Sequence, residues 1–257
     1  MASRLARSRK ARLGTEFLCE WIYRPLAHVV VLALAPFRVP PPAVVLGSAA
    51  AGLVGAVELA RGHLVLAALL VQLKTVLDNA DGQLARLTGR VTAFGRYLDS
   101  ECDLLVNAAL FAAVGWSAGR WLAPAVGFVA LTGVLSVNFN LERLARGLPA
   151  SWDSSRLGRL YGALYGWQDV LIERFVERRL RGLGEEARSA YHDWATVRVL
   201  ANLGMTTQLA VFGLCIAVGH PLAFALMALA EVGFVAALFV RRESFVNVDR
   251  EVVLEHR

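Results

Sequence analysis

Four aspartates stand at helical spacing inside two otherwise apolar stretches of the chain. They are Asp78, Asp81, Asp99 and Asp103. The first two are three residues apart and the last two are four apart, so each pair projects from one face of a helix. Ionised groups at membrane depth are costly and are rare unless they face a polar cavity and act there. A short turn through Thr88 and Gly89 would fold the two helices antiparallel and gather the four carboxylates in one pocket.

Four carboxylates crowded in a medium of low dielectric repel one another unless cations neutralise them. Hard divalent ions such as Mg²⁺ or Mn²⁺ suit such a pocket, because they take oxygen ligands from carboxylates and from substrate phosphates. Two such ions would polarise a phosphoryl group and stabilise its leaving oxygen. A carboxylate less committed to metal could take the proton of an attacking hydroxyl. The pattern therefore predicts metal-dependent transfer of a phosphate-linked group.

Small residues and one cation lie between these acids. Gly82, Ala85 and Gly95 remove side-chain bulk, which lets a large ligand approach the backbone, and Arg86 supplies a cation suited to phosphate. Lys74 precedes Asp78 by one helical turn and would either neutralise a carboxylate or reach the acceptor cavity. On the fourth apolar stretch, a face with Ser136, Asn138 and Asn140 would line a pocket or, as we favour, form interhelical hydrogen bonds.

The elements that position these residues are predicted to be membrane helices. The chain has 257 residues, of which 56% are hydrophobic, and long runs with few charges predict spans of roughly 20 residues. Six can be identified: 42–60, 64–86, 92–116, 121–141, 197–218 and 222–240. Residues 17–37 carry charges and have a short apolar run, which favours an amphipathic helix along the interface over a further span.

Lys and Arg are distributed unequally between the two sides of these spans. Only Arg61 and Arg120 fall on one side, which predicts that both termini and the long connection are cytoplasmic. This arrangement divides the chain into a cytoplasmic N-terminus with an interfacial helix (1–41), a catalytic membrane domain (42–241) and a cytoplasmic tail (242–257). The basic connection 142–196 would lie on the anionic inner leaflet or pack against the spans. The net charge of +6 is thus spread over a membrane surface, and we expect no nucleic-acid partner.

The aspartates belong to a longer pattern, D-x-x-D-G-x-x-A-R, eight residues, then G-x-x-x-D-x-x-x-D. The positions that it specifies are Asp78, Asp81, Gly82, Ala85, Arg86, Gly95, Asp99 and Asp103. A chance match to eight specified residues has a frequency on the order of 10⁻¹⁰ per starting position, at about one in twenty per residue type. The run closely resembles the signature of the CDP-alcohol phosphotransferase family.

This resemblance implies an all-α integral membrane protein with six transmembrane helices preceded by an N-terminal interfacial amphipathic helix. It implies that Asp78, Asp81 and Asp99 hold a two-metal centre, and that Asp103 contributes to it while acting as general base. The acceptor hydroxyl would attack the phosphorus distal to cytidine, and CMP would leave. The residues that the resemblance assigns to the CDP donor are Gly82, Ala85, Arg86 and Gly95. Relatives are homodimers, so we expect a homodimer in the cell (inner) membrane with its active site facing the cytoplasm.

The chain departs from the family pattern at two places. Many members begin the first span with Pro-Asn and a Thr three residues beyond the Asn, where this chain has Pro41, Pro42 and Val45. Members that use phosphorylated polyols often carry Arg after the last motif aspartate, where this chain has Leu104. The acceptor alcohol is therefore open. The favoured donor is CDP-diacylglycerol, the alternative is a soluble CDP-alcohol with a lipid or inositol-type acceptor, and a cation transporter or channel is a remote third reading.

Overall fold

The computed structural model of the chain describes residues 14–182 and 194–255. Within them every regular element is a helix and no strand is present, as predicted. The long helices are α3 (Pro41–Ala60), α4 (Leu64–Leu87), α5 (Ala93–Ala118), α6 (Leu122–Ala145), α11 (Met205–Ala217) and α12 (Pro221–Glu255). The shorter elements are η1 (Cys19–Tyr23), α2 (Arg24–Leu34), η2 (Ala35–Phe37), α7 (Arg156–Tyr161), η3 (Gly162–Gly166), α8 (Trp167–Leu180) and α10 (Trp194–Ala201). Parts of the predicted cytoplasmic segments 1–41, 142–196 and 242–257 lie outside the described residues.

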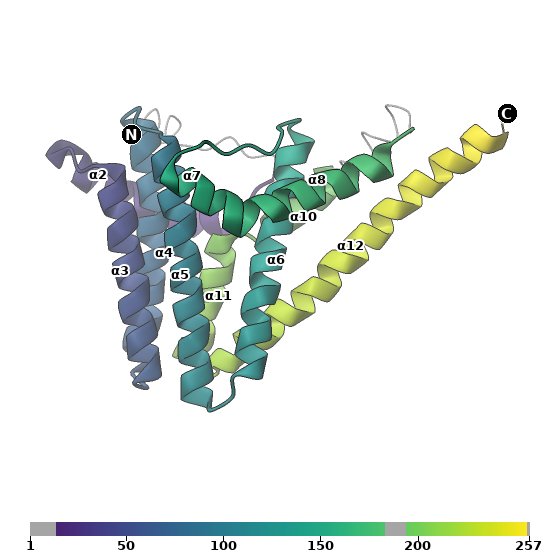
Figure 1. Cartoon of the computed structure of the whole chain (residues 1–257). Helices are drawn as coiled ribbons and strands as arrows, with labels where there is room; N and C mark the ends of the chain where they lie inside the picture. Colours follow the sequence, from purple (N-terminus) through teal and green to yellow (C-terminus); the bar gives the residue numbers. More distant parts are fainter. Residues whose placement is uncertain (1–13, 183–193, 256–257) are drawn as a thin grey trace.

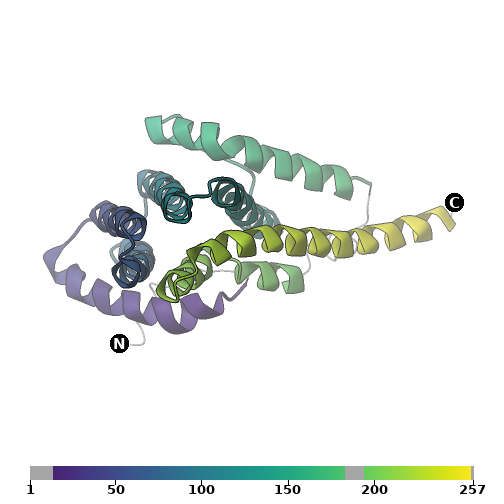
Figure 2. The ribbon, with the colours of Figure 1, turned by 90° about the horizontal axis from the view of Figure 1, so that it is seen from below.

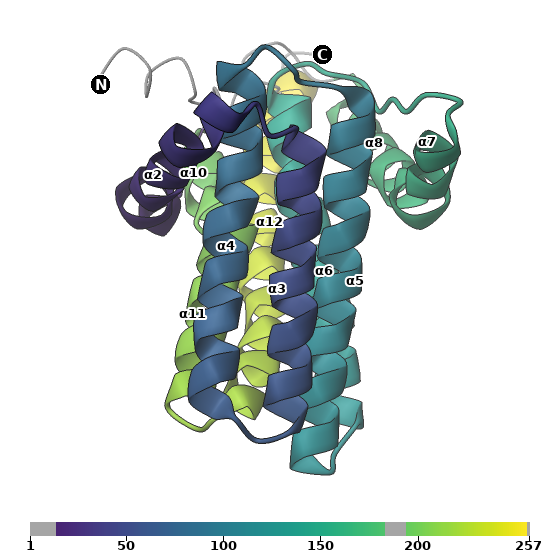
Figure 3. The same cartoon turned by 90° about the vertical axis from the view of Figure 1, so that its left-hand side faces the viewer.

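Helices α3, α4, α5, α6 and α11 run side by side as a bundle (Figures 1 and 3). The turns that join α3 to α4, α5 to α6 and α11 to α12 lie at one end, and the α4–α5 turn lies at the other (Figure 3). Local sequence explains the α4–α5 turn. Gly89 takes a φ of 67°, which costs glycine little, and the Thr92 side chain accepts a hydrogen bond from Gly95 N at 3.1 Å to cap α5. The turn therefore joins the part of α4 that carries Asp78 and Asp81 to the part of α5 that carries Asp99 and Asp103.

The predicted fifth span is divided in the structure. Residues 197–218 were expected to form one helix, but α10 and α11 are separate and bent by 41°. The Glu16 carboxylate accepts hydrogen bonds from Thr207 N at 2.8 Å and from Thr207 Oγ1 at 3.0 Å. Phe17 N donates to the Asn202 side chain at 3.0 Å. The N-terminal segment thus satisfies the backbone N–H of Thr207, which a continuous helix would satisfy within itself.

Within the described residues, three helices are long and apolar enough to cross a membrane, namely α3, α6 and the first 23 residues of α12. A fourth span results if the bent α10–α11 pair is counted as one. Helices α4 and α5 are as long as these, but they carry the charged side chains of the aspartate motif. These apolar helices indicate a membrane protein, and the predicted site lies on two long helices that carry charged side chains within their length.

Helix α2 and the α7–α8 segment lie across the bundle axis near the end that holds the α4–α5 turn (Figure 3). Figure 2 shows α3, α4 and α5 almost end-on, whereas α2 and the α7–α8 segment appear lengthwise on opposite sides. Helix α2 packs on α4 through Ala27 and Val31, which contribute to one buried cluster with Ala80 and Leu84. The segment predicted as an interfacial helix is thus helical and attached to the outside of the bundle.

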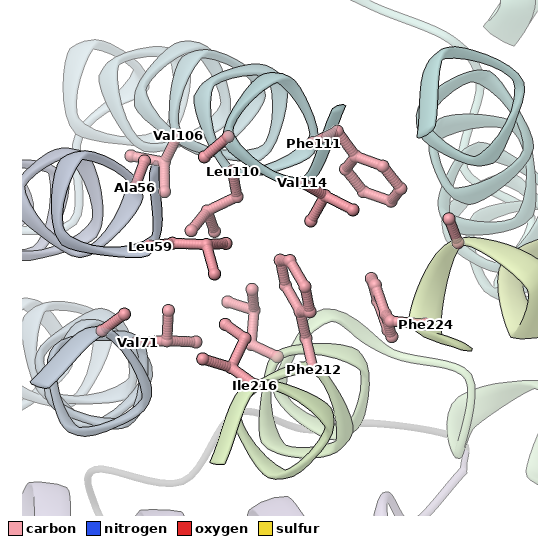
Figure 4. Packing of buried hydrophobic residues seen from close by; sticks show 14 of the residues in the cluster. Ala56, Leu59, Val71, Val106, Leu110, Phe111, Val114, Phe212, Ile216 and Phe224 are labelled. Atoms are coloured by element: carbon pink, nitrogen blue, oxygen red, sulfur yellow. The ribbon is translucent and has the colours of Figure 1, made fainter. Parts of the chain in front are cut away.

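The main apolar core begins one turn beyond Asp103 on α5. Figure 4 shows Val106, Leu110 and Val114 of α5 turned toward side chains of α3, α4 and α11. Phe212 of α11 stacks on Phe224 of α12 with ring centroids 4.4 Å apart. Helix α3 packs against both α4 and α5, and these two do not pack closely on each other. The spacing between the two aspartate helices is therefore set largely through α3.

Gly52 is the position where α3 approaches its neighbours most closely at the level of the site. A Cβ there would lie 2.4 Å from Val106 Cγ1 and 3.2 Å from Lys74 Cγ. We expect Gly52→Val to lower the free energy of unfolding by about 1–3 kcal/mol through overpacking, measured by thermal unfolding in detergent. Gly47→Val on the same helix is the matched control, because a Cβ there meets nothing within 4 Å. Equal melting temperatures for the two variants would contradict this packing.

Candidate active site

Three of the four motif aspartates converge between α4 and α5. One carboxylate oxygen from each of Asp78, Asp99 and Asp103 lies within 4.8 Å of the others. The helical spacing brings these groups to the facing sides of two helices that a short turn connects. This arrangement agrees with the predicted convergence, and the group has the oxygen chemistry that divalent ions select.

Asp81 stands beside this group without being part of it. Its side chain is buried, and its Oδ2 atom has no hydrogen-bond partner. Burying a carboxylate oxygen without a partner is costly, and a cation bound among the aspartates would remove that cost. The three converging aspartates, with Asp81 beside them, therefore fit a divalent metal centre.

Lys74 joins the two aspartate helices. Its side chain is 1% exposed, and its Nζ lies 2.8 Å from Asp78 Oδ1 and 2.5 Å from Asp103 Oδ1. Of the two roles considered for Lys74 from the sequence, the structure supports neutralisation of carboxylates. An ammonium between two helices that do not pack closely on each other also holds them at a set distance.

The small residues of the motif have different surroundings. A Cβ on Gly82 would lie 3.2 Å from Nη1 of Arg86, so the absent side chain leaves room for that guanidinium. A Cβ on Gly95 would lie 3.3 Å from Thr92 Oγ1, at the cap of α5. Ala85 is partly exposed on the same helix as Arg86. Gly82 therefore positions the predicted phosphate-binding cation, and Gly95 permits the close cap that starts α5.

Residues next to the aspartates tie the site to distant segments. Asn79 donates to Thr206 Oγ1 at 3.1 Å and accepts from Cys19 Sγ at 3.2 Å. Ser48 of α3 donates to the Lys74 carbonyl at 3.0 Å. These bonds connect the aspartate helix α4 to η1, α11 and α3. Asn79 thus acts as a structural neighbour of the site rather than as part of the aspartate group.

The long connection supplies contacts that sequence reasoning did not assign. Tyr165 OH donates to the Ser100 carbonyl at 3.3 Å, one residue after Asp99. The Tyr161 ring lies between those of Tyr97 and Tyr165, with centroids 5.4 and 5.2 Å apart. Burial raises the pKa of both Tyr161 and Tyr165, so both phenols stay protonated as hydrogen-bond donors. In the sequence, only the amphipathic pattern of the connection indicated that it packs against the spans, as Tyr161 and Tyr165 do on α5.

A buried polar network fastens the connection to α6. Asn140 Nδ2 donates to Asp169 Oδ1 at 2.8 Å, which agrees with the favoured hydrogen-bonding role of Asn140. Tyr161 OH donates to the other Asp169 oxygen at 3.1 Å. Arg143 pairs with Glu173 at 3.0 Å and donates to the Leu148 carbonyl at 2.9 Å. Buried polar groups that satisfy one another in this way fix the position of α8.

Comparison with known proteins adds an independent line of evidence. The family model described as CDP-alcohol phosphatidyltransferase matches residues 38–164. A Rubrobacter xylanophilus protein named bifunctional IPC transferase and DIPP synthase is 33% identical over 143 residues, which are 56% of this chain and 31% of that protein. A Corynebacterium glutamicum phosphatidylinositol phosphate synthase is 46% identical over 55 residues, which are 21% of this chain and 25% of that protein. The chain thus spans less than a third of the length of either relative.

A likeness to one solved structure is weaker. The crystal structure of Mycobacterium tuberculosis phosphatidylinositol phosphate synthase with CDP-DAG bound aligns with 76% of this chain and 90% of that chain. The TM-score is 0.41 and the sequence identity is 20%. The matched family region, residues 38–164, contains all eight motif positions, and it runs from α3 into the first part of the long connection.

Proposed function

This chain carries a CDP-alcohol phosphatidyltransferase domain, and from that premise we propose that it transfers a phosphatidyl or other substituted phosphate group to a small polar alcohol. The donor is CDP-diacylglycerol and the by-product is CMP. The observation that carries the proposal is the convergence of Asp78, Asp99 and Asp103 between two helices of that domain. Two relatives with overlapping sequence, from Corynebacterium glutamicum and Mycobacteroides abscessus, are named phosphatidylinositol phosphate synthase, which supports a phosphatidyl product.

In this proposal the four motif aspartates hold two Mg²⁺ or Mn²⁺ ions. The metal centre supplies electrostatic stabilisation of the transferred phosphoryl group and of the leaving oxygen. Arg86, held over Gly82, binds donor phosphate oxygens as a fixed cation. Gly82, Ala85 and Gly95 are proposed to help seat the CDP moiety, Gly82 by leaving room for the Arg86 guanidinium and Gly95 by permitting the close cap of α5 beside Thr92.

The proposed group transfer is a single displacement at phosphorus, in which one P–O bond forms and one breaks. Asp103 accepts the proton of the acceptor hydroxyl as its oxygen forms a bond to the phosphorus distal to cytidine. The bond between that phosphorus and the bridging oxygen breaks, and CMP leaves with the electron pair. The Lys74 ammonium contacts Asp103 and orients this carboxylate between the two helices.

The proposed topology has six spans in the cell (inner) membrane, with the 17–37 helix at the interface. The 1–41 segment, the connection and the 242–257 tail are cytoplasmic, and so is the active site. The sparse basic residues Arg61 and Arg120 support this topology, because they stand at the turns opposite the aspartate end. Much of the apolar part of α6 and α12 is not covered by the described residues, which leaves an apolar surface for lipid and for the second copy of a homodimer.

The test is CMP release by the purified protein with CDP-diacylglycerol, Mg²⁺ and a panel of polyols and phosphorylated polyols. Removal of divalent ions with EDTA is expected to lower turnover by at least about 100-fold, because four crowded carboxylates cannot bind donor phosphates unaided. Added Mg²⁺ or Mn²⁺ should restore it. Full turnover in EDTA would contradict the metal centre, and cation flux in liposomes independent of cytidine nucleotide would indicate a transporter.

A soluble CDP-alcohol donor is the second candidate, because Pro42 and Val45 stand where many family members carry polar Asn and Thr at the start of the first span. Radiolabelled CDP-diacylglycerol and CDP-choline or CDP-inositol, offered side by side with the same acceptors, distinguish the two. Product label from CDP-diacylglycerol alone supports the first proposal.

A further inference from the structure

We infer that the outward face of the α7–η3–α8 segment, residues 156–180, binds the anionic lipid surface of the leaflet at the aspartate end of the bundle. The whole α7–η3–α8 segment is called the arm below. The inference does not depend on the reaction, because it rests on the outer side of a segment whose inner side alone contacts the site.

The inner side of the arm is fastened firmly to the bundle. Asp169, Val176 and Leu180 are buried, and Asp169 receives the Asn140 and Tyr161 hydrogen bonds described above. The Trp152 indole lies against the backbone of Gly162, where a Cβ would come 2.5 Å from Nε1. The arm is therefore a rigid element whose outer side keeps a constant orientation.

The outer side of the arm carries large apolar side chains along its length, with exposed arginines beside them. Trp167 and Leu171 are each 60% exposed, and Leu160 and Phe175 are 44% and 45% exposed. The three residues on α8 are spaced by four, so they form one stripe on the helix. Phe175, at one end of the stripe, contacts the Phe239 ring of α12 and the Arg179 guanidinium, whereas Trp167 and Leu171 remain largely exposed in the described part of the chain. A row of large apolar side chains on a crosswise helix is typical of helices that lie in a membrane interface.

The exposed charged residues of the arm indicate which kind of membrane surface the stripe would bind. The exposed charged residues along the arm are Arg156, Arg159, Arg174, Glu177 and Arg178. Four of these five are arginines, and the acidic residues Asp169 and Glu173 are engaged by the network on the inner side. Apolar side chains flanked by exposed arginines complement acyl chains beneath anionic headgroups.

Helix α2, which also lies across the bundle axis, supports the placement of the arm in the membrane interface. Figure 3 shows α2 and the α7–α8 segment on opposite sides of the bundle at a similar height, near the α4–α5 turn. Along η1 and α2, Trp21 and Val29 are 77% and 64% exposed. Two helices that flank a bundle at one level and both present aromatic or aliphatic side chains outward agree with a single interface plane.

The test places an environment-sensitive NBD label on the arm of the full chain in nanodiscs. Leu171→Cys carries the label on the apolar stripe, and Glu177→Cys is the matched control on another side of the same helix. Both variants have Cys102→Ser and Cys215→Ser, and the buried Cys19 is retained. The nanodiscs contain phosphatidylcholine alone or with phosphatidylglycerol, plus doxyl-labelled lipid. Iodide is the aqueous quencher.

The label at position 171 is expected to be quenched by doxyl lipid and protected from iodide, with the reverse at position 177. Doxyl quenching at 171 should be at least about twofold stronger with phosphatidylglycerol present, and Arg174→Gln with Arg178→Gln should remove that difference. Thermal unfolding verifies that the double variant is folded, and Arg174→Lys with Arg178→Lys should keep the difference.

Iodide access at 171 in both lipids would overturn the inference. Protection from both quenchers would indicate a protein partner, and equal doxyl quenching in both lipids would exclude anionic recognition.

Discussion

Asp103→Asn is expected to lower the rate of CMP release by about 10³-fold or more, which is in the upper range for loss of a general base. The amide cannot accept the proton of the acceptor hydroxyl, and it removes one anionic oxygen from a group whose members lie within 4.8 Å. The measurement is steady-state CMP release with saturating donor, acceptor and Mg²⁺. Thermal unfolding of the same preparation shows whether the variant is folded.

Glu101→Gln is the matched control for this variant. It makes the same change from carboxylate to amide two residues earlier on α5, and Glu101 does not belong to the aspartate group. We expect its turnover to remain close to that of the wild type. Full activity of a folded Asp103→Asn variant would contradict the assignment of the base, and an equal loss in both variants would indicate general damage to α5.

Lys74→Met is expected to destabilise the metal-free protein strongly. The methionine keeps much of the apolar length of the buried side chain but removes the ammonium that contacts Asp78 and Asp103. Breaking a buried charge network by removing one partner costs roughly 3–5 kcal/mol. Thermal unfolding in EDTA should therefore show a melting temperature lowered on the order of 10 °C. Mg²⁺ should restore most of this loss, because it supplies positive charge to the same carboxylates.

A double variant distinguishes this electrostatic role from simple packing. Lys74→Met combined with Asp78→Asn removes one charge of each sign, so the double variant should be more stable in EDTA than Lys74→Met alone. A packing role predicts that the second substitution brings no recovery. A Lys74→Met protein with the wild-type melting temperature in EDTA would show that the lysine does not hold the helices together.

Much of the site could be predicted because its information is local. Asp78 and Asp81, and likewise Asp99 and Asp103, share a helix face through their spacing alone. Gly89 and the cap residue Thr92 encode the turn that reverses the chain between the two helices. The apolar runs likewise predict the positions of the long helices to within a few residues, except where α10 and α11 are divided and where α12 extends further.

Other features depend on residues far apart in the chain. The break between α10 and α11 depends on a hydrogen bond from Thr207 to Glu16, and these residues are 191 positions apart. The attachment of the arm depends on Asn140 and Asp169, which are 29 positions apart. Hydropathy and periodicity describe the environment of each segment but not its partner, so the sequence predicts that Asn140 forms hydrogen bonds but identifies neither Asp169 nor Glu16 as a partner.

The aspartate motif itself shows where the two kinds of information meet. The sequence by itself determined which carboxylates share a helix face, because the helical repeat converts spacing into direction. Only the tertiary structure decided that α3, through Gly52, sets the distance between the two helices. It also decided that the ammonium of Lys74 lies between Asp78 and Asp103. The physical reason is that backbone geometry is repeated locally, whereas close packing and ion pairing depend on which distant surfaces meet.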